Sequence, residues 1–270
     1  MTDVSRAVFY APHPDDETLS MGLAMITFIA VGYDVHLVSM NKGGNGGPLG
    51  SFNGDNACNW SGEHPYTHNP SREGYTAHTA TSLATARFLE ARAALGAMAT
   101  VTPSPGITLG NIYHHDGGLP DAFGNTPTAV ADAQAVIASY VQDLPNSFHY
   151  TMSPTDDHPD HAACGQALRN LKTVDPSLAN ARFFVSRLYW ATSQPNGQYP
   201  ADVAAQPDLA WFNAGTRKAE FDAILRGRVV KAFNSWNPAC GSYAIGYHQV
   251  VNQFLNNFGA TVSIGNLWHA

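Results

Sequence analysis

The sequence has few charged residues, and basic residues are the rarer kind. Only 13% of its 270 residues are charged, and 14 Lys and Arg against 21 Asp and Glu give a formal charge of −7. Nucleic-acid binding needs clustered Lys and Arg to neutralise phosphates, and no basic stripe occurs in the chain. We therefore expect no nucleic-acid partner.

Long apolar runs and paired cysteines are also missing. No segment approaches the roughly 18 uninterrupted apolar residues of a membrane-spanning helix, and the first residues lack the features of a signal peptide. The three cysteines, Cys58, Cys164 and Cys240, are too few for a disulfide framework and show no CxxC spacing. We expect reduced thiols in a cytoplasmic protein, with a Cys58–Cys240 disulfide as the alternative.

The apolar residues, 44% of the chain, are arranged in alternating strand-like and helix-like segments. Strand patterns occur at 7–10, 34–40, 106–113, 147–152 and 181–190, and helix patterns at 19–31, 80–96, 128–144, 158–171 and 217–233. Such alternation is typical of an α/β fold with a mostly parallel, doubly wound sheet and helices on both faces. We expect a single domain over residues 1–270.

Residues 41–78 interrupt this alternation. They are rich in Gly, Asn, Pro and aromatic residues and show no sustained periodicity. A loop of this length in a compact domain is usually functional or disordered. We predict an inserted loop, either a plain surface loop or a wall of a binding site. Residues 114–125 are predicted to form turns.

Two stretches dense in His and Asp each follow a predicted strand. "HPDDE" comes after the first strand and carries His13, Asp15 and Asp16; "SPTDDHPDHAACG" comes after the strand at 147–152. In the second stretch, Asp157 is predicted to cap a helix, which places His158 and His161 on one helix face. Ligands bind at the carboxyl ends of strands in parallel sheets, so the two stretches should meet there. The first turn lacks the G-x-G-x-x-G of a dinucleotide site.

Two histidines and a carboxylate are a common ligand set for zinc or iron. We predict one zinc ion per chain, with His13, Asp16 and His161 as ligands. Asp15 would then remain beside the metal as a general base. Glu17 is predicted only to start the following helix.

The second stretch contributes two further candidates. His158, one turn from His161, is predicted to stabilise a developing oxyanion, and Asp160 to orient His158. Six other histidines are predicted to lie in loops without binding metal; they are His64, His68, His78, His114, His115 and His248. The competing hypothesis is a non-haem Fe(II) oxygenase that uses His13, Asp15 and His161 as its triad.

The motifs "APHPDDE" and "HPDH" together resemble the paired signature of the PIG-L/LmbE-like N-acetylglucosamine deacetylases. "ARFLEARAALGA" and "HDGGLPD" resemble further conserved segments of that family, and the likeness extends over about residues 7–171. It implies a Rossmann-like fold, a zinc-dependent N-deacetylase and a small-molecule glycoconjugate substrate. It also implies that Arg87 and Asp116 contact the sugar; the alternatives are an ion pair of Arg87 with Glu90 and a simple turn role for Asp116.

The resemblance extends to the substrate. The enzymes that deacetylate glycopeptide-antibiotic (teicoplanin-type) pseudoaglycones are the most similar group, and the long insertion, with Trp60, Tyr66 and Tyr75, fits a large substrate. The alternative is a small conjugate of inositol, malate or chito-oligosaccharide type. A non-catalytic sugar-binding module is disfavoured, because binding alone needs no spare carboxylate beside the metal.

Overall fold

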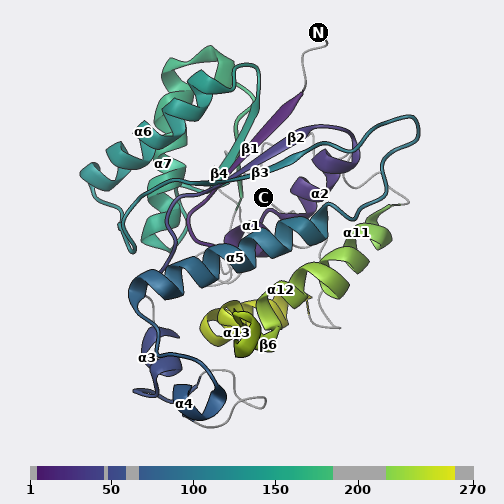
Figure 1. Cartoon of the computed structure of the whole chain (residues 1–270). Helices are drawn as coiled ribbons and strands as arrows, with labels where there is room; N and C mark the ends of the chain where they lie inside the picture. The colour runs from purple at the N-terminus through teal and green to yellow at the C-terminus, as the bar shows by residue number, and fades with distance from the viewer. Residues whose placement is uncertain (1–4, 46–47, 59–66, 185–216, 259–270) are drawn as a thin grey trace.

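A five-stranded parallel sheet forms the centre of the fold (Figure 1). The computed structural model describes residues 5–45, 48–58, 67–184 and 217–258. The strand order is β3-β2-β1-β4-β5, and the strands are β1 (Arg6–Ala11), β2 (Asp34–Ser39), β3 (Ile112–Asp116), β4 (Phe148–Met152) and β5 (Arg182–Phe184). The order reverses beside β1, as in doubly wound Rossmann-like folds. The predicted fold class is confirmed.

Helices cover both faces of the sheet because β1 is apolar on both sides. Phe9 and the other odd-numbered residues of β1 pack against α2 (Gly22–Ala30) and α5 (Ala80–Met98). Val8 and Tyr10 face the opposite layer, α6 (Pro127–Asp143) and α7 (Pro159–Val174). Full burial on both faces explains the continuous apolar run that marks this strand in the sequence.

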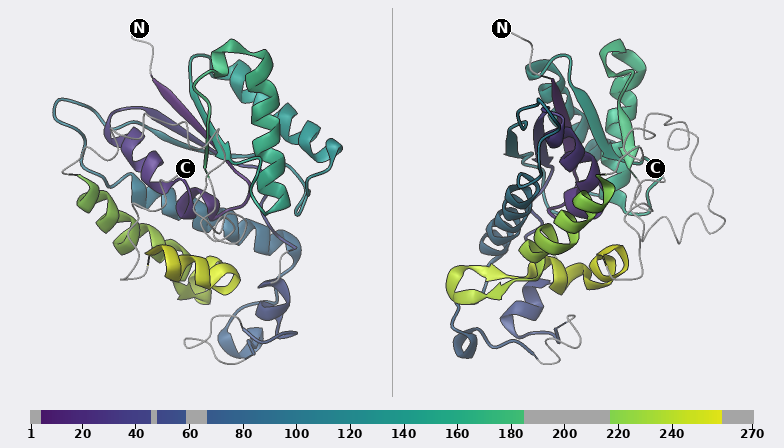
Figure 2. Two further views of the ribbon diagram at one scale, coloured as in Figure 1. Left: turned by 180° about the vertical axis from the view of Figure 1, so that it is seen from behind. Right: turned by 90° about the vertical axis from the view of Figure 1, so that its right-hand side faces the viewer.

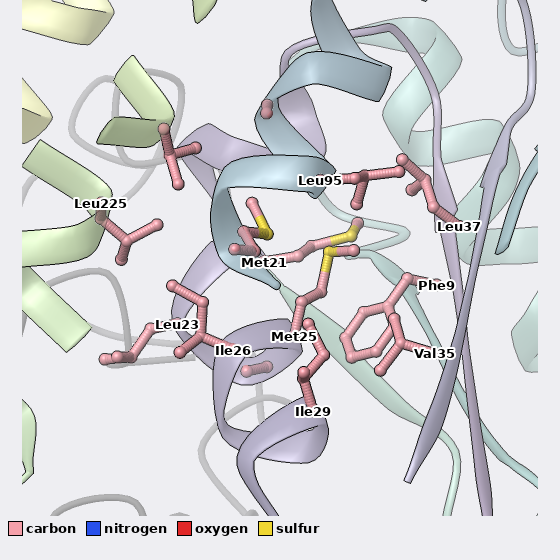
Figure 3. Packing of buried hydrophobic residues seen from close by; sticks show 14 of the residues in the cluster. Phe9, Met21, Leu23, Met25, Ile26, Ile29, Val35, Leu37, Leu95 and Leu225 are labelled. Atoms are coloured by element: carbon pink, nitrogen blue, oxygen red, sulfur yellow. The ribbon is translucent and has the colours of Figure 1, made fainter. Parts of the chain in front are cut away.

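The core on the α2 side extends into the C-terminal third of the chain. Leu225 joins Met21, Ile26 and Leu95 in the same buried cluster, beside Phe9 of the sheet (Figure 3). The segment predicted as one helix consists of α11 (Lys218–Ile224), a π-helical turn (Leu225–Val229) and α12 (Val230–Asn234). Figure 2 shows these yellow-green helices alongside α5.

Short elements complete the described chain. They are α1 (Asp16–Leu19), α3 (Pro48–Asn53), α4 (Pro70–Glu73), β6 (Trp236–Asn237), β7 (Ser242–Tyr243), α13 (Ile245–Phe258) and 3₁₀ turns at Pro176–Leu178 and Pro238–Cys240. Strands β6 and β7 form an antiparallel pair. Helix α13 has non-helical backbone angles at Val250 and is kinked there.

The described part of the insertion packs against the rest of the protein. Phe52 in α3 is fully buried with Leu83 of α5 and Ile245 of α13, and its carbonyl accepts the Tyr75 hydroxyl at 2.7 Å. This part of the insertion is therefore not a plain surface loop. Trp60 and Tyr66 lie outside the described residues.

Several local predictions are corrected. The third strand covers Ile112–Asp116, so His114, His115 and Asp116 belong to a strand and not to a turn. Pairing with β2 sets this register, and half-exposure at the sheet edge hides the usual apolar pattern. His248 lies in helix α13 and not in a loop.

The ends of other elements also differ from prediction. Helix α7 is capped by His158 and not by Asp157. The strand predicted at 181–190 is β5 up to Phe184, and the rest lies outside the described residues. Cys58 and Cys240, both within the described ranges, are not joined by a disulfide. Within those ranges, no helix has the length and apolarity that a membrane crossing requires. The single-domain organisation remains a prediction.

Candidate metal centre and active site

The two His/Asp stretches meet at the carboxyl edge of the sheet. Strands β1 and β4 are parallel neighbours, with Ala7 opposite Phe148 and Phe9 opposite Tyr150. The loops that leave their carboxyl ends are therefore adjacent. One loop carries His13 and leads into α1, and the other leads into α7 with His161 in its first turns.

Three atoms from these loops form a compact triangle. Asp16 Oδ2 lies 3.1 Å from both His13 Nδ1 and His161 Nε2, and the two nitrogens are 3.3 Å apart. Zinc bonds to nitrogen and oxygen of about 2.0–2.2 Å place tetrahedral ligand atoms about 3.4 Å from one another. The spacing of this ligand triangle therefore fits a single ion.

Two further carboxylates orient the histidine rings. Asp160 Oδ2 lies 3.0 Å from His13 Nε2, and Asp156 Oδ1 lies 3.2 Å from His161 Nδ1. Asp160 is therefore placed to accept a hydrogen bond from His13 Nε2, and Asp156 lies close to His161 Nδ1. Carboxylates of this kind fix metal-binding histidines in place. Two imidazole nitrogens and a carboxylate oxygen that converge on one point form a ligand set that suits a metal ion.

The position of Asp160 differs from the prediction that it orients the ring of His158. Its carboxylate contacts His13 and accepts the Gly124 N–H at 2.6 Å, whereas only its backbone N–H reaches His158. Asp156 was not predicted to take part. Its only sequence signal is its place in the acidic stretch that contains Asp160.

The charges at the ligand triangle favour a bound positive charge. Burial disfavours the imidazolium form of His161, but Asp16 and Asp156 outweigh burial and raise the pKa of His161 to about 10. Burial also acts to raise the pKa of Asp16, yet His161 and His13 hold it well below its ordinary value. Both shifts indicate a carboxylate-rich centre that attracts a cation.

Asp15 lies beside the ligand triangle and is held there by Arg87. Its Oδ2 accepts a hydrogen bond from Arg87 Nη2 at 3.2 Å. Burial raises the pKa of Asp15 to about 6, although the Arg87 charge lowers it. Its backbone has φ 140° and ψ −29°, a strained conformation for a non-glycine residue.

Glu17 supports this strained backbone. Its Oε2 accepts the Asp15 N–H at 2.8 Å, and its Oε1 accepts the Thr18 hydroxyl at 2.9 Å. The side chain is fully buried, and burial followed by the charge of Asp15 raises its pKa to about 8. The prediction that Glu17 only starts a helix is incomplete, because the residue also positions Asp15.

Arg87 is buried and donates hydrogen bonds to three acceptors. Besides Asp15, it donates from Nη1 to the Gly43 carbonyl at 2.9 Å and from Nη2 to the Pro14 carbonyl at 3.2 Å. Gly43 has φ +61°, and a Cβ at that position would overlap the guanidinium group. Glu90, the alternative partner, instead accepts backbone N–H groups of α13.

His158 also lies beside the ligand triangle. Its Nδ1 accepts the Asp160 N–H at 3.3 Å, so the neutral ring carries its proton on Nε2. Burial, followed by the charges of His161 and His13, lowers its pKa to about 4. A ring nitrogen of His158 lies within 4.8 Å of nitrogens of His13 and His161. This neutral imidazole is placed either to donate a hydrogen bond or to add a ligand.

A cavity of about 60 Å³ opens onto these groups. It is lined by His13, Asp15, Asp16, Arg87, His158, His161, Val250 and Gln253. Ligand pockets are typically about 300–1,000 Å³, so this space is much smaller than a usual site for a whole ligand. Val250 and Gln253 come from α13, and no sequence motif marks them.

Asp116 does not line this cavity. It ends β3, pairs with Lys42 and accepts the Gly118 N–H at 3.0 Å. The carboxylate is half-exposed at the same edge of the sheet. Its contact with a sugar therefore remains a prediction.

Comparisons with known proteins identify the family and support the fold. The family model described as PIG-L, GlcNAc-PI de-N-acetylase, matches residues 8–172. Two curated 1D-myo-inositol 2-acetamido-2-deoxy-alpha-D-glucopyranoside deacetylases, from Mycobacterium sp. strains JLS and KMS, are each 25% identical over 211 residues. The alignment covers 75% of this chain but only 59% of each relative, so the chain spans about three-fifths of their length.

Solved structures with a similar fold carry related descriptions. The pseudoaglycone deacetylase of the antimicrobial reagent A40926 is 21% identical, with a TM-score of 0.50 over 74% of this chain and 71% of that one. The zinc-inhibited form of a teicoplanin deacetylase is 14% identical, with a TM-score of 0.51 over 86% and 87%. At these identities the likeness shows the fold alone. The family match, however, covers more than half of the sequence, and the chain belongs to the PIG-L family.

Proposed function

We propose that this chain is a zinc-dependent N-deacetylase that hydrolyses the N-acetyl amide of an N-acetylglucosaminyl group. The observation that carries the proposal is the ligand triangle of Asp16, His13 and His161, whose atoms lie 3.1–3.3 Å apart with Asp15 beside them. Three protein ligands leave room for water and substrate, as in catalytic zinc sites. Membership of the PIG-L family supports the same reaction.

The ligand triangle, Asp15 and His158 each have a role in this reaction. A bound zinc ion supplies Lewis-acid chemistry and lowers the pKa of water from about 15.7 to about 7. Asp15 accepts the proton of the attacking water and returns it to the departing amine nitrogen. His158 donates its Nε2 proton in a hydrogen bond to the developing oxyanion. The products are acetate and a free amino sugar.

Arg87 and Glu17 act on Asp15. The first holds its carboxylate and the second holds its backbone N–H, so the base has one defined orientation. Such positioning matters because a misplacement of about 1 Å can cost about 100-fold in rate.

The decisive experiment separates metal binding from proton transfer. Asp15→Asn removes the base without touching the ligand triangle, so metal content should stay at the wild-type value. Acetate release should fall by about 10²–10⁴-fold, the usual contribution of general acid–base catalysis. Asp143→Asn, an exposed change on α6, is the matched control. Wild-type acetate release by Asp15→Asn would refute the assignment of the base.

For the acceptor, we propose a large conjugate of glycopeptide-antibiotic pseudoaglycone type. The names of the two structural relatives point to such compounds, whereas the mycobacterial relatives support an inositol-linked sugar equally well. The small cavity accepts only the acetyl end, so the surrounding surface must select the rest of the substrate. A panel of acetylated substrates, from free N-acetylglucosamine to a glycosylated peptide, tests this choice. Preference for the inositol conjugate or the free sugar would reject the large substrate.

The oxygenase hypothesis finds less support. It needs Asp15 as a metal ligand, but the Asp15 carboxylate bonds to Arg87 while Asp16 contacts both histidines. Acetate release under strict exclusion of dioxygen should be unchanged. Dependence of the reaction on dioxygen would favour the oxygenase.

A further inference from the structure

A second group of potential metal ligands lies outside the active site. Cys58, His68 and His248 each offer one ligand atom, and the three atoms lie within 4.8 Å of one another. We propose that this Cys58 cluster binds its own transition-metal ion of the zinc class. It shares no residue with the ligand triangle.

The two imidazoles face each other through nitrogens that both carry lone pairs. His68 Nε2 lies 3.0 Å from His248 Nε2. His248 Nδ1 donates to the Ala244 carbonyl at 2.7 Å, and His68 Nδ1 donates to Glu73 Oε2 at 2.8 Å. A carbonyl and a carboxylate both accept, so each neutral ring keeps its proton on Nδ1. A metal ion bound by both Nε2 atoms, or a proton shared between them, accounts for this close approach.

The supporting contacts resemble those around metal-binding histidines. Glu73 is itself held, because its Oε1 accepts the Asn69 N–H at 2.8 Å. Metal-ligating histidines usually donate their other ring nitrogen to a carboxylate or a backbone carbonyl. His68 donates to a carboxylate, and His248 donates to a backbone carbonyl.

Both imidazoles are buried among aromatic rings. His68 is 2% exposed and His248 is fully buried. The Phe52 ring lies 4.7 Å from His248, and the Trp236 ring lies 4.9 Å from His68, measured between centroids. Cys58 is half-buried, and its sulfur lies within 4.8 Å of a nitrogen of each ring.

The ligand set selects the class of metal. Thiolate and imidazole suit zinc and related ions and exclude magnesium and calcium. Zinc bonds of about 2.3 Å to sulfur and 2.0 Å to nitrogen separate tetrahedral ligand atoms by about 3.3–3.5 Å. The three atoms already lie within 4.8 Å of one another. Water would complete the coordination.

The ion would join two distant parts of the chain. Cys58 and His68 belong to the 41–78 insertion, whereas His248 lies 180 residues beyond His68, on α13. The same helix contributes Val250 and Gln253 to the catalytic cavity. A metal ion in the Cys58 cluster would therefore link the insertion to the helix that lines the catalytic cavity.

Cobalt substitution tests this site independently of activity. Co²⁺ bound to a thiolate has a charge-transfer band in the near ultraviolet, and the ligand triangle contains no sulfur. The cobalt-loaded protein should show this band. Cys58→Ser should lose it, and Cys240→Ser, a change at an exposed cysteine, should keep it.

Metal analysis gives the second readout. Wild type should hold two ions per chain, Cys58→Ser and His161→Ala one each, and the double variant none, with circular dichroism to confirm that each variant is folded. A folded wild type with a single ion that His161→Ala removes, and without the cobalt band, would overturn the proposal. The two histidines would then share only a proton.

Discussion

The guanidinium group of Arg87 holds the carboxylate of Asp15, with Nη2 3.2 Å from Oδ2 and both side chains buried. The family resemblance implies a contact of Arg87 with the sugar, and the residue does line the cavity. The structure adds a second role for Arg87, which is to fix the orientation of the proposed base. This ion pair spans 72 residues and joins α5 to the loop after β1.

Removal of Arg87 should destabilise the protein strongly. Arg87→Ala leaves the Asp15 charge buried and the Gly43 carbonyl without its donor, and breaking a buried ion pair costs about 3–5 kcal/mol. Urea denaturation at neutral pH measures the effect. Arg92→Ala, on the exposed face of the same helix, should change the free energy of unfolding by less than about 0.5 kcal/mol. Equal effects of the two changes would contradict the buried pair.

Asp160 should affect metal affinity through His13. Asp160→Asn replaces the carboxylate that orients the His13 ring, and changes to such partners weaken metal binding by about 10–100-fold. Competition with a chromophoric chelator, in a Cys58→Ser background that leaves only the ligand triangle, measures the affinity. The exposed neighbour Asp157→Asn should bind as tightly as that background. If Asp160 acts only on His158, turnover will fall while affinity stays constant.

Glu17 should affect catalysis through the backbone of Asp15. Glu17→Ala removes the acceptor of the Asp15 N–H, a contact that holds the Asp15 backbone at its strained φ of 140°. We expect a fall in kcat of about 100-fold, because misplacement of a reacting group by about 1 Å costs that much. Metal content should remain near that of wild type. Glu17→Gln retains a carbonyl acceptor and should recover most of the loss; no recovery would contradict this positioning role.

Glu90 should make stability depend on pH. Burial raises its pKa to about 8 from the ordinary 4.5, although hydrogen bonds from the Ile245 and Gly246 N–H groups oppose the shift. The folded state therefore keeps a proton that the unfolded chain releases above pH 4.5. The stability from this group is complete below pH 4.5 and is lost as pH rises toward 8.

Chemical denaturation at several pH values measures this dependence. The contribution has a slope of at most about 1.4 kcal/mol per pH unit across that window. Glu90→Gln does not titrate, so its stability should fall less steeply over the same range. Parallel pH profiles for wild type and Glu90→Gln would contradict the raised pKa.

The sequence by itself was sufficient to predict the doubly wound sheet and the meeting of His13, Asp16 and His161. Both follow from local pattern, since apolar runs mark the strands and parallel strands bring their carboxyl ends to one edge. Most helix positions followed in the same way. The register of β3 could not be predicted in this way, because that edge strand is half-exposed and carries polar residues.

Only the tertiary structure decided which side chains support these residues. Arg87 pairs with Asp15, Asp160 contacts His13, and His68 approaches His248. Gln253 lines the cavity. These contacts join segments 72 to 180 residues apart or depend on one choice of partner. Sequence periodicity specifies which face of an element is buried, but not which residue of another element it meets. That choice depends on how the helices pack over the sheet, and it determines here how the proposed base is held and where a second metal ion would bind.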